Sequence, residues 1–130
     1  MLEPMITPIY AGLIALIFVA LSVQVIRARR HHRVSLGDNE NPDLLRRVRG
    51  QANCAEYAPI GLLLLLMLEL QSGASVLIHA VGLMLLAGRA LHGFALSGTQ
   101  QWILGRQWGM LLTFVALIIG AVANIGVALF

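Results

Sequence analysis

Four stretches of about twenty apolar residues each restrict the fold of this chain more than any other feature. They lie at about residues 6–26, 46–70, 75–96 and 106–129. A helix rises about 1.5 Å per residue, so each stretch can cross the roughly 30 Å hydrocarbon core of a membrane. Because backbone polar groups inside lipid must bond within their own segment, each stretch is expected to be a helix. We predict an all-α, integral membrane four-helix bundle that forms a single domain over residues 1–130.

The composition agrees with a membrane protein and argues against a nucleic-acid-binding one. Hydrophobic residues make up 58% of the 130 residues and charged residues only 12%, which is about half of the usual fraction in soluble proteins. The basic residues are all arginine, and seven of the nine lie between Arg27 and Arg49. Basic residues concentrate in cytoplasmic membrane loops, whereas base stacking requires interleaved aromatic residues that this segment lacks. We therefore expect no nucleic-acid partner.

The positions of the arginines also predict the orientation of the bundle. The first link between apolar stretches is rich in arginine, the second has none, and the third ends at Arg106. The positive-inside rule then places both termini outside and the first and third links in the cytoplasm, in an up-down-up-down arrangement. The second link, residues 71–73, is short, so the second and third helices should be antiparallel neighbours. Asn41 or Asp43 is expected to cap the second helix.

Polar residues interrupt two of the apolar stretches near their predicted cytoplasmic ends. Arg49, Asn53 and Glu56 have the spacing i, i+4, i+7, which places them on one face of the second helix. Arg89 and His92, at i and i+3, share a face of the third helix. Ionisable groups at membrane depth are costly and are functional candidates by default. The topology places Arg89 at the depth of Glu56, so we predict an ion pair between them.

These polar groups are also compatible with purely structural roles. An Arg89–Glu56 pair would set helix register, and Asn53 or His92 would join helices as satisfied interior groups. Taken together, however, these residues favour an anion-binding site, because they combine several guanidiniums with a carboxylate, an amide and an imidazole. The sequence has no paired carboxylates, Ser-His-Asp set, glycine-rich phosphate loop or histidine metal motif. We therefore expect no metal, and an anionic nucleophile would come from a ligand.

One segment of the second helix resembles a known family signature. Arg49-x-Gln51-x-Asn53-Cys54-x-Glu56-Tyr57-x-Pro59 is similar to the motif of the MAPEG superfamily, the membrane-associated proteins of eicosanoid and glutathione metabolism. This motif is especially close to that of the leukotriene C synthase branch. Residues 24–35, QVIRARRHHRVS, are also similar to that branch. Residues 88–92, GRALH, look more like the small bacterial inner-membrane members. The resemblance covers nearly the whole chain.

The resemblance implies a homotrimer in a bacterial inner membrane that binds glutathione between subunits near the cytoplasmic face. The glutathione thiolate would attack a lipophilic small-molecule substrate entering from the bilayer, and Arg106 would be the catalytic residue that stabilises the thiolate. The positions that match ligand-contacting or polar positions of the family are Arg30 (or its neighbour Arg29), Arg49, Gln51, Asn53, Glu56, Tyr57, Arg89 and His92.

The chain departs from the family pattern at two positions. Leu96 stands where several family enzymes carry a tyrosine, and Met110 replaces an aromatic hydroxyl near the start of the fourth helix. The link before Arg106 is also a few residues longer than in the leukotriene branch. The resemblance as a whole implies a membrane glutathione S-transferase, with or without peroxidase activity. A non-catalytic membrane protein that binds a lipid or a partner is the alternative.

Overall fold

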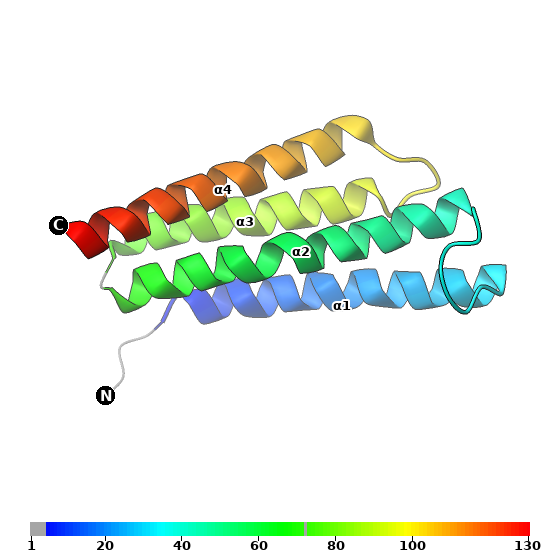
Figure 1. Cartoon of the computed structure of the whole chain (residues 1–130), viewed down its shortest axis with the longest axis horizontal. Helices are drawn as coiled ribbons and strands as arrows, with labels where there is room; N and C mark the ends of the chain where they lie inside the picture. The colour runs from blue at the N-terminus through cyan, green and yellow to red at the C-terminus, as the bar shows by residue number, and fades with distance from the viewer. Residues whose placement is uncertain (1–4, 72) are drawn as a thin grey trace.

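The computed structural model describes residues 5–71 and 73–130, so Ser72 of the predicted second link lies outside the described residues. Four helices follow one another along the chain: α1 (Thr7–His32), α2 (Pro42–Leu70), α3 (Ser75–Ala95) and α4 (Ile103–Leu129). Each is long and apolar enough to cross a membrane. Consecutive helices run in opposite directions (Figure 1). The predicted all-α fold with four membrane-crossing helices is confirmed.

Three helices extend beyond the apolar stretches that predicted them. α1 continues past residue 26 to His32, α2 begins at Pro42, and α4 begins at Ile103. The extra turns of α1 and α2 carry charged residues, which hydropathy cannot distinguish from a loop, whereas that of α4 is Ile103-Leu104-Gly105. The start of α2 is capped by Asn41, whose Oδ1 accepts a hydrogen bond from the Leu44 N–H at 3.0 Å. The extensions lie at the end of the bundle that carries the α1–α2 and α3–α4 links, here called the link end (Figure 1).

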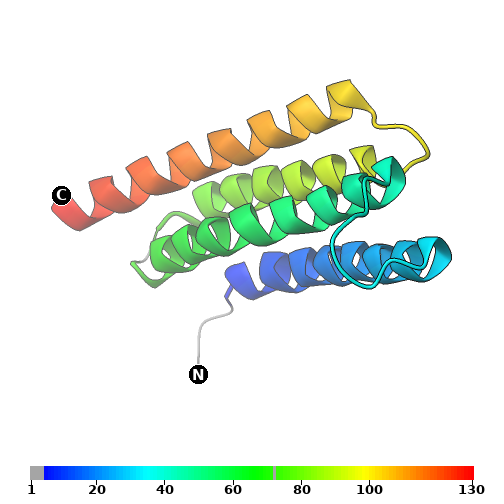
Figure 2. The same cartoon turned by 45° about the vertical axis from the view of Figure 1, so that its right-hand side comes forward.

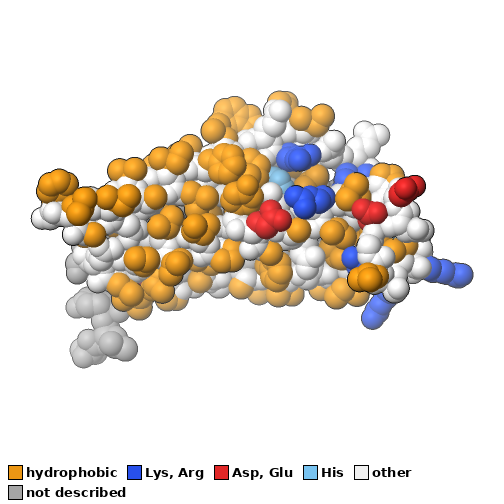
Figure 3. Space-filling model, viewed as in Figure 1, with side chains coloured by type: hydrophobic (Ala, Val, Ile, Leu, Met, Phe, Trp, Pro, Cys, Tyr) orange, Lys and Arg blue, Asp and Glu red, His pale blue; other side chains and the backbone are white. Residues whose placement is uncertain are grey.

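Two helices form the centre of the bundle and two flank it. α2 and α3 contact each other, α1 packs on both of them, and α4 packs on both from the other side. In the described residues α1 and α4 do not contact each other, and Figure 2 shows them on opposite sides of the central pair. Leu65 and Leu85 are fully buried between the helices, whereas exposed apolar side chains cover much of the face seen in Figure 3.

At the end opposite the link end, two polar residues hold helices together. The Glu69 carboxylate accepts hydrogen bonds from the backbone N–H groups of Ile6 and Thr7, the latter at 2.9 Å. A negative charge is favourable there because the first N–H groups of α1 have no partner within the helix. Tyr10 of α1 places its hydroxyl 2.9 Å from His79 Nδ1 of α3. Glu69 and His79 therefore join α1 to α2 and α3.

Glycines let α3 and α4 approach each other closely. A Cβ atom on Gly88 would lie 2.5 Å from Thr113 Oγ1, and one on Gly109 would lie 2.7 Å from the His92 backbone nitrogen. Small residues at helix interfaces allow this kind of backbone approach in membrane proteins. The close approach brings Thr113 of α4 against α3, beside Arg89.

Substitution of Gly109 by alanine is expected to destabilise the fold by about 1–3 kcal/mol, because the added methyl group would force α3 and α4 apart. The free energy of unfolding in mixed micelles, measured by titration with a denaturing detergent, would show the loss. Gly12→Ala is the matched control, since a Cβ atom there would meet nothing within 4 Å. The control should be neutral or stabilising by up to about 1 kcal/mol; equal losses in the two variants would contradict the close approach.

Candidate functional site

The interior of the bundle near the link end contains a buried arginine. The Arg89 side chain is 1% exposed. Its Nε and Nη2 donate to Thr113 Oγ1 of α4 at 3.1 and 2.7 Å, and its Nη1 donates to Asn53 Oδ1 of α2 at 2.5 Å. Nη2 also points to Met110 Sδ at 3.4 Å. Arg89 therefore ties α3 to both α2 and α4 through neutral acceptors.

The predicted ion pair between Arg89 and Glu56 is wrong. Within the described residues, the ion pairs all involve Asp43, and Glu56 is exposed on the surface of α2. The guanidinium of Arg89 instead reaches Asn53, which lies almost one turn before Glu56 on the same helix. Arg89 therefore lies less than one helical turn from the level of Glu56 along the bundle, but three residues along a helix also rotate a side chain by about 60°. That rotation turns Glu56 away from the interior.

Arg89 fixes the orientation of two side chains that lie between it and the surface. A guanidinium has only donors, so the Asn53 amide must turn its oxygen inward, which leaves its NH₂ group free to donate elsewhere. The Arg89 guanidinium carbon also lies 5.4 Å from the centre of the Tyr57 ring, a cation–π contact. Tyr57 in turn packs edge-on against Phe114 of α4, with ring centres 5.6 Å apart.

His92 lies one turn along α3 from Arg89 and is also buried, with 3% of its surface exposed. Its Nδ1 has no hydrogen-bond partner among the described residues. Buried polar atoms are nearly always paired, so an unpaired ring nitrogen indicates a position completed by water or by a ligand. The predicted placement of Arg89 and His92 on one helix face agrees with their common burial.

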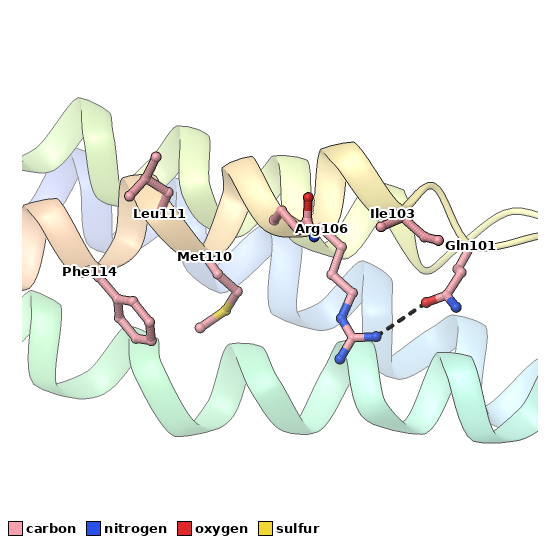
Figure 4. Close-up of a pocket in the computed structure, with 7 residues that line it drawn as sticks. Gln101, Ile103, Arg106, Met110, Leu111 and Phe114 are labelled. Carbon is pink, nitrogen blue, oxygen red and sulfur yellow. Dashed lines mark hydrogen bonds between the residues drawn. The ribbon is translucent and has the colours of Figure 1, made fainter.

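An open groove of about 550 Å³ runs along α4 beside this interior network. Arg106 lines the groove, is exposed, and donates to Gln101 Oε1 at 3.2 Å. Figure 4 shows the Arg106 side chain extending from α4 toward α2, with Met110 and Phe114 further along the same helix. Met110 lines the groove, and its sulfur also contacts the Arg89 guanidinium. The groove thus has a cationic end and an apolar continuation.

Charged side chains gather outside this network, over the seam between α2 and α4. Arg49 and Glu56 of α2 are exposed, as is Arg106 of α4. Figure 3 shows basic side chains beside an acidic one over this seam, in the half of the molecule toward the link end. The surroundings are otherwise apolar. An exposed polar patch at this depth of a membrane helix is costly unless it is covered by water, a ligand or a second polypeptide.

Two of the predicted site residues lie away from this patch. Gln51 faces α1, where its Nε2 donates to Ser22 Oγ at 3.1 Å. Arg30 is exposed near the end of α1 and lines a separate hollow of about 350 Å³ with its neighbour Arg29. Because α1 and α4 do not contact each other in the described residues, Arg30 cannot reach Arg106 within one chain. The candidate residues therefore form two groups on different sides of the subunit.

Asp43 organises the link end, a role that the sequence analysis did not predict. Its carboxylate lies 3.0 Å from His32 Nε2 and 3.1 Å from nitrogen atoms of both Arg46 and Arg47. Arg46 also donates to the backbone carbonyls of residues 98 and 99, in the α3–α4 link. This network joins the end of α1, the start of α2 and the link that leads to Arg106.

Sequence reasoning also missed Thr113, the hydroxyl that holds Arg89. The available signal was a polar residue within the apolar stretch of α4 between Trp108 and Ala123. Leu96 and Met110, the two departures from the family pattern, both have packing roles. Leu96 is buried and packs against Gly50: a Cβ atom added to Gly50 would lie 3.4 Å from the Leu96 Cβ atom. In the described residues no cluster of three His, Cys, Asp or Glu side chains could hold a metal ion.

Comparisons with known proteins agree with this architecture. The model of the MAPEG family matches residues 7–126. Inner membrane protein YecN from Escherichia coli K12 is 34% identical over 122 residues, which cover 93% of this chain and 91% of that protein. YecN from Escherichia coli O6:H1 matches with the same identity and coverage. A family match over nearly the whole length, together with four membrane-crossing helices, shows that the chain belongs to the MAPEG family.

Proposed function

We propose that this protein is a membrane glutathione S-transferase that conjugates glutathione to a lipophilic electrophile. The observation that carries the proposal is the groove along α4, in which an exposed arginine adjoins an apolar wall. Arg106 uses one donor on Gln101 and has further N–H groups for an anion. Met110, Leu111 and Phe114 line the groove beyond it. Such a groove suits a thiolate at one end and an apolar molecule at the other.

The chemistry would use each group in a specific way. Glutathione binds as the co-substrate, and its thiol loses a proton to solvent. The guanidinium of Arg106 stabilises the resulting thiolate, because a nearby positive charge favours the anionic form. The thiolate sulfur then forms a bond to the electrophilic carbon, and the leaving group or electron pair departs from that carbon. Arg49, Glu56 and the free NH₂ group of Asn53 would hold the charged and amide groups of the tripeptide.

A homotrimer would complete this site. Within one chain the α2–α4 patch lacks Arg30 and Gln51, which lie on the α1 side. A second copy that places its α1 against the α2–α4 seam would bring both groups together and cover the exposed polar patch. A guanidinium from each of two subunits would then contact one ligand. In this assembly Arg89 and His92 support the site from inside, since both are buried within their own subunit.

We further propose that the protein resides in a bacterial inner membrane. Its relative in Escherichia coli is named as an inner membrane protein. The link end carries most of the arginines, so the positive-inside rule places that end in the cytoplasm and both termini outside. The proposed glutathione site would then face the compartment that contains glutathione, and the electrophile would enter from the bilayer.

One observation favours a second candidate, a non-catalytic protein that binds a lipid or partner. Both positions where family enzymes carry aromatic hydroxyls are used for packing here. Leu96 fills space beside Gly50, and Met110 contacts the guanidinium of Arg89. A site without these hydroxyls has fewer groups to hold glutathione in a reactive position. Binding without turnover would therefore favour this candidate.

Glutathione binding and turnover can be measured separately on the purified protein. Glutathione at about 100 times its dissociation constant is expected to stabilise the folded protein by about 2.7 kcal/mol, seen as a higher unfolding temperature in detergent. Appearance of thiolate absorbance and conjugation of a generic aromatic electrophile would support the transferase. Stabilisation without either signal would support the non-catalytic candidate. Absence of stabilisation by glutathione, at concentrations where a glutathione transferase control is saturated, would contradict the transferase.

A further inference from the structure

We propose that a basic pocket between α1 and α2 at the link end binds the phosphate headgroup of an anionic phospholipid. The pocket has a volume of about 370 Å³ and is separate from the groove along α4 and from the hollow beside Arg30. It is lined by residues of α1, α2 and the α3–α4 link, including Arg27 and His31 of α1 and Arg47 of α2. The proposed transferase activity has no use for this pocket.

The two arginines of the pocket are available to an anion in different ways. Arg27 is exposed and makes no hydrogen bond or ion pair with any residue that the structure describes. Arg47 is held in place, because its Nε donates to Asp43 Oδ1 at 3.1 Å and its Nη1 approaches Gln24 Oε1 at 3.5 Å. These contacts leave the far edge of the Arg47 guanidinium free. A guanidinium held in place beside one with all its donors free suits an oxyanion.

Asp43 also lines the pocket, but it does not cancel the positive charge. Its carboxylate is shared among Arg46, Arg47 and His32. The positive charges of Arg46 and Arg47 therefore already exceed the single negative charge of this carboxylate, before that of Arg27 is counted. The imidazole of His31 packs edge-on against that of His32 and adds a further hydrogen-bonding group at the rim. The pocket thus has an excess of positive charge without a protein anion to match it.

The surface next to the pocket favours a lipid over a free phosphate. Leu13 precedes His31 by 18 residues and Leu16 precedes Arg27 by 11, so both lie on the side of α1 that carries the pocket. Their side chains are 43% and 67% exposed. This apolar stripe leads along α1 from the pocket toward the middle of the membrane. A phospholipid would place its phosphate between the arginines and its acyl chains along the stripe, as basic pockets at the ends of membrane helices do with acidic lipids.

The test is binding of phosphatidylglycerol to the delipidated full-length protein, measured by native mass spectrometry in a neutral detergent. Arg27→Gln is the first variant, because Arg27 supports no contact within the described fold and its loss should not unfold the protein. We expect the dissociation constant for phosphatidylglycerol to rise about tenfold, the effect of losing a charge-assisted hydrogen bond. Arg47→Gln should weaken binding by a similar factor.

Arg33→Gln is the matched control, since it removes the same charge from the end of the same helix but lies outside the pocket. It should leave the dissociation constant within about twofold. An equal loss in Arg33→Gln and Arg27→Gln would overturn the pocket in favour of general attraction to charge. Glycerol phosphate tests the source of the phosphate: binding as tight as that of phosphatidylglycerol would overturn the lipid and indicate a soluble phosphate ligand.

Discussion

Substitution of Asn53 by leucine is expected to destabilise the folded protein by about 3 kcal/mol, and a second substitution of Arg89 should recover much of that loss. Arg89 is 1% exposed and donates its shortest hydrogen bond, 2.5 Å, to Asn53 Oδ1. Removal of this acceptor leaves part of a buried charge without a partner, which costs more than the loss of a neutral hydrogen bond. In Asn53→Leu/Arg89→Leu that charge is gone. The free energy of unfolding in mixed micelles would be compared for the four chains.

The same measurements distinguish this network from the ion pair that the sequence suggested. Glu56→Gln should change stability by no more than about 0.5 kcal/mol, because the Glu56 side chain is exposed. Its effect should add to that of Arg89→Leu, whereas Asn53→Leu and Arg89→Leu should be strongly non-additive. Additive losses for Asn53 and Arg89, or a coupling between Glu56 and Arg89 of more than about 1 kcal/mol, would contradict the structure.

Substitution of Arg106 by glutamine is expected to lower kcat for glutathione conjugation about 100-fold, the usual effect of removing a group that stabilises a reacting anion. Arg106 is the cation of the α4 groove, and its only hydrogen bond within the described residues is to Gln101. The variant should therefore fold normally but fail to generate thiolate absorbance on addition of glutathione. Steady-state conjugation rates and the absorbance of the bound thiol would be measured on the same preparations.

Arg106→Lys serves as the graded comparison for this residue. Lysine retains the positive charge but lacks the planar fork of the guanidinium, so we expect an activity between those of the parent protein and Arg106→Gln. Thiolate absorbance should follow the same order as kcat. A rate for Arg106→Gln equal to that of the parent would remove Arg106 from the catalytic role, whatever its effect on glutathione binding.

The fold could be predicted from the sequence because it depends on the total hydrophobicity of each successive stretch of the chain. Four apolar stretches of membrane length leave the helix as the available structure, since lipid offers no partners for free backbone groups. The cap of α2 could be narrowed to Asn41 or Asp43, and Asn41 is the cap, because a capping side chain acts on residues close to it in sequence. The helix bounds were less accurate. The polar turns of α1 after residue 26 and of α2 before residue 46 resemble loops by hydropathy alone.

The candidate site could be predicted only in part. The spacing of Arg49, Asn53 and Glu56 predicted one shared face of α2, but Asn53 bonds to the buried Arg89 whereas Arg49 and Glu56 are exposed. Arg89 and His92 are both buried, as a shared face of α3 requires. The partner of Arg89 could not be predicted, because it depends on the rotation of three helices about their axes. Thr113 enters the network only because Gly88 and Gly109 allow α3 and α4 to approach closely. No local pattern in α4 contains that information.

The sequence by itself determined that this chain forms four membrane-crossing helices, that its arginines lie at one end, and that its motif is that of the MAPEG family. These properties follow from hydrophobicity, charge and residue order, which act along the chain. Only the tertiary structure decided that Arg89 bonds to Asn53 and Thr113, that Glu56 faces outward, and that Arg30 is separated from Arg106. Hydrogen bonds depend on a few tenths of an ångström between helices, and that distance is set by side-chain packing across the bundle.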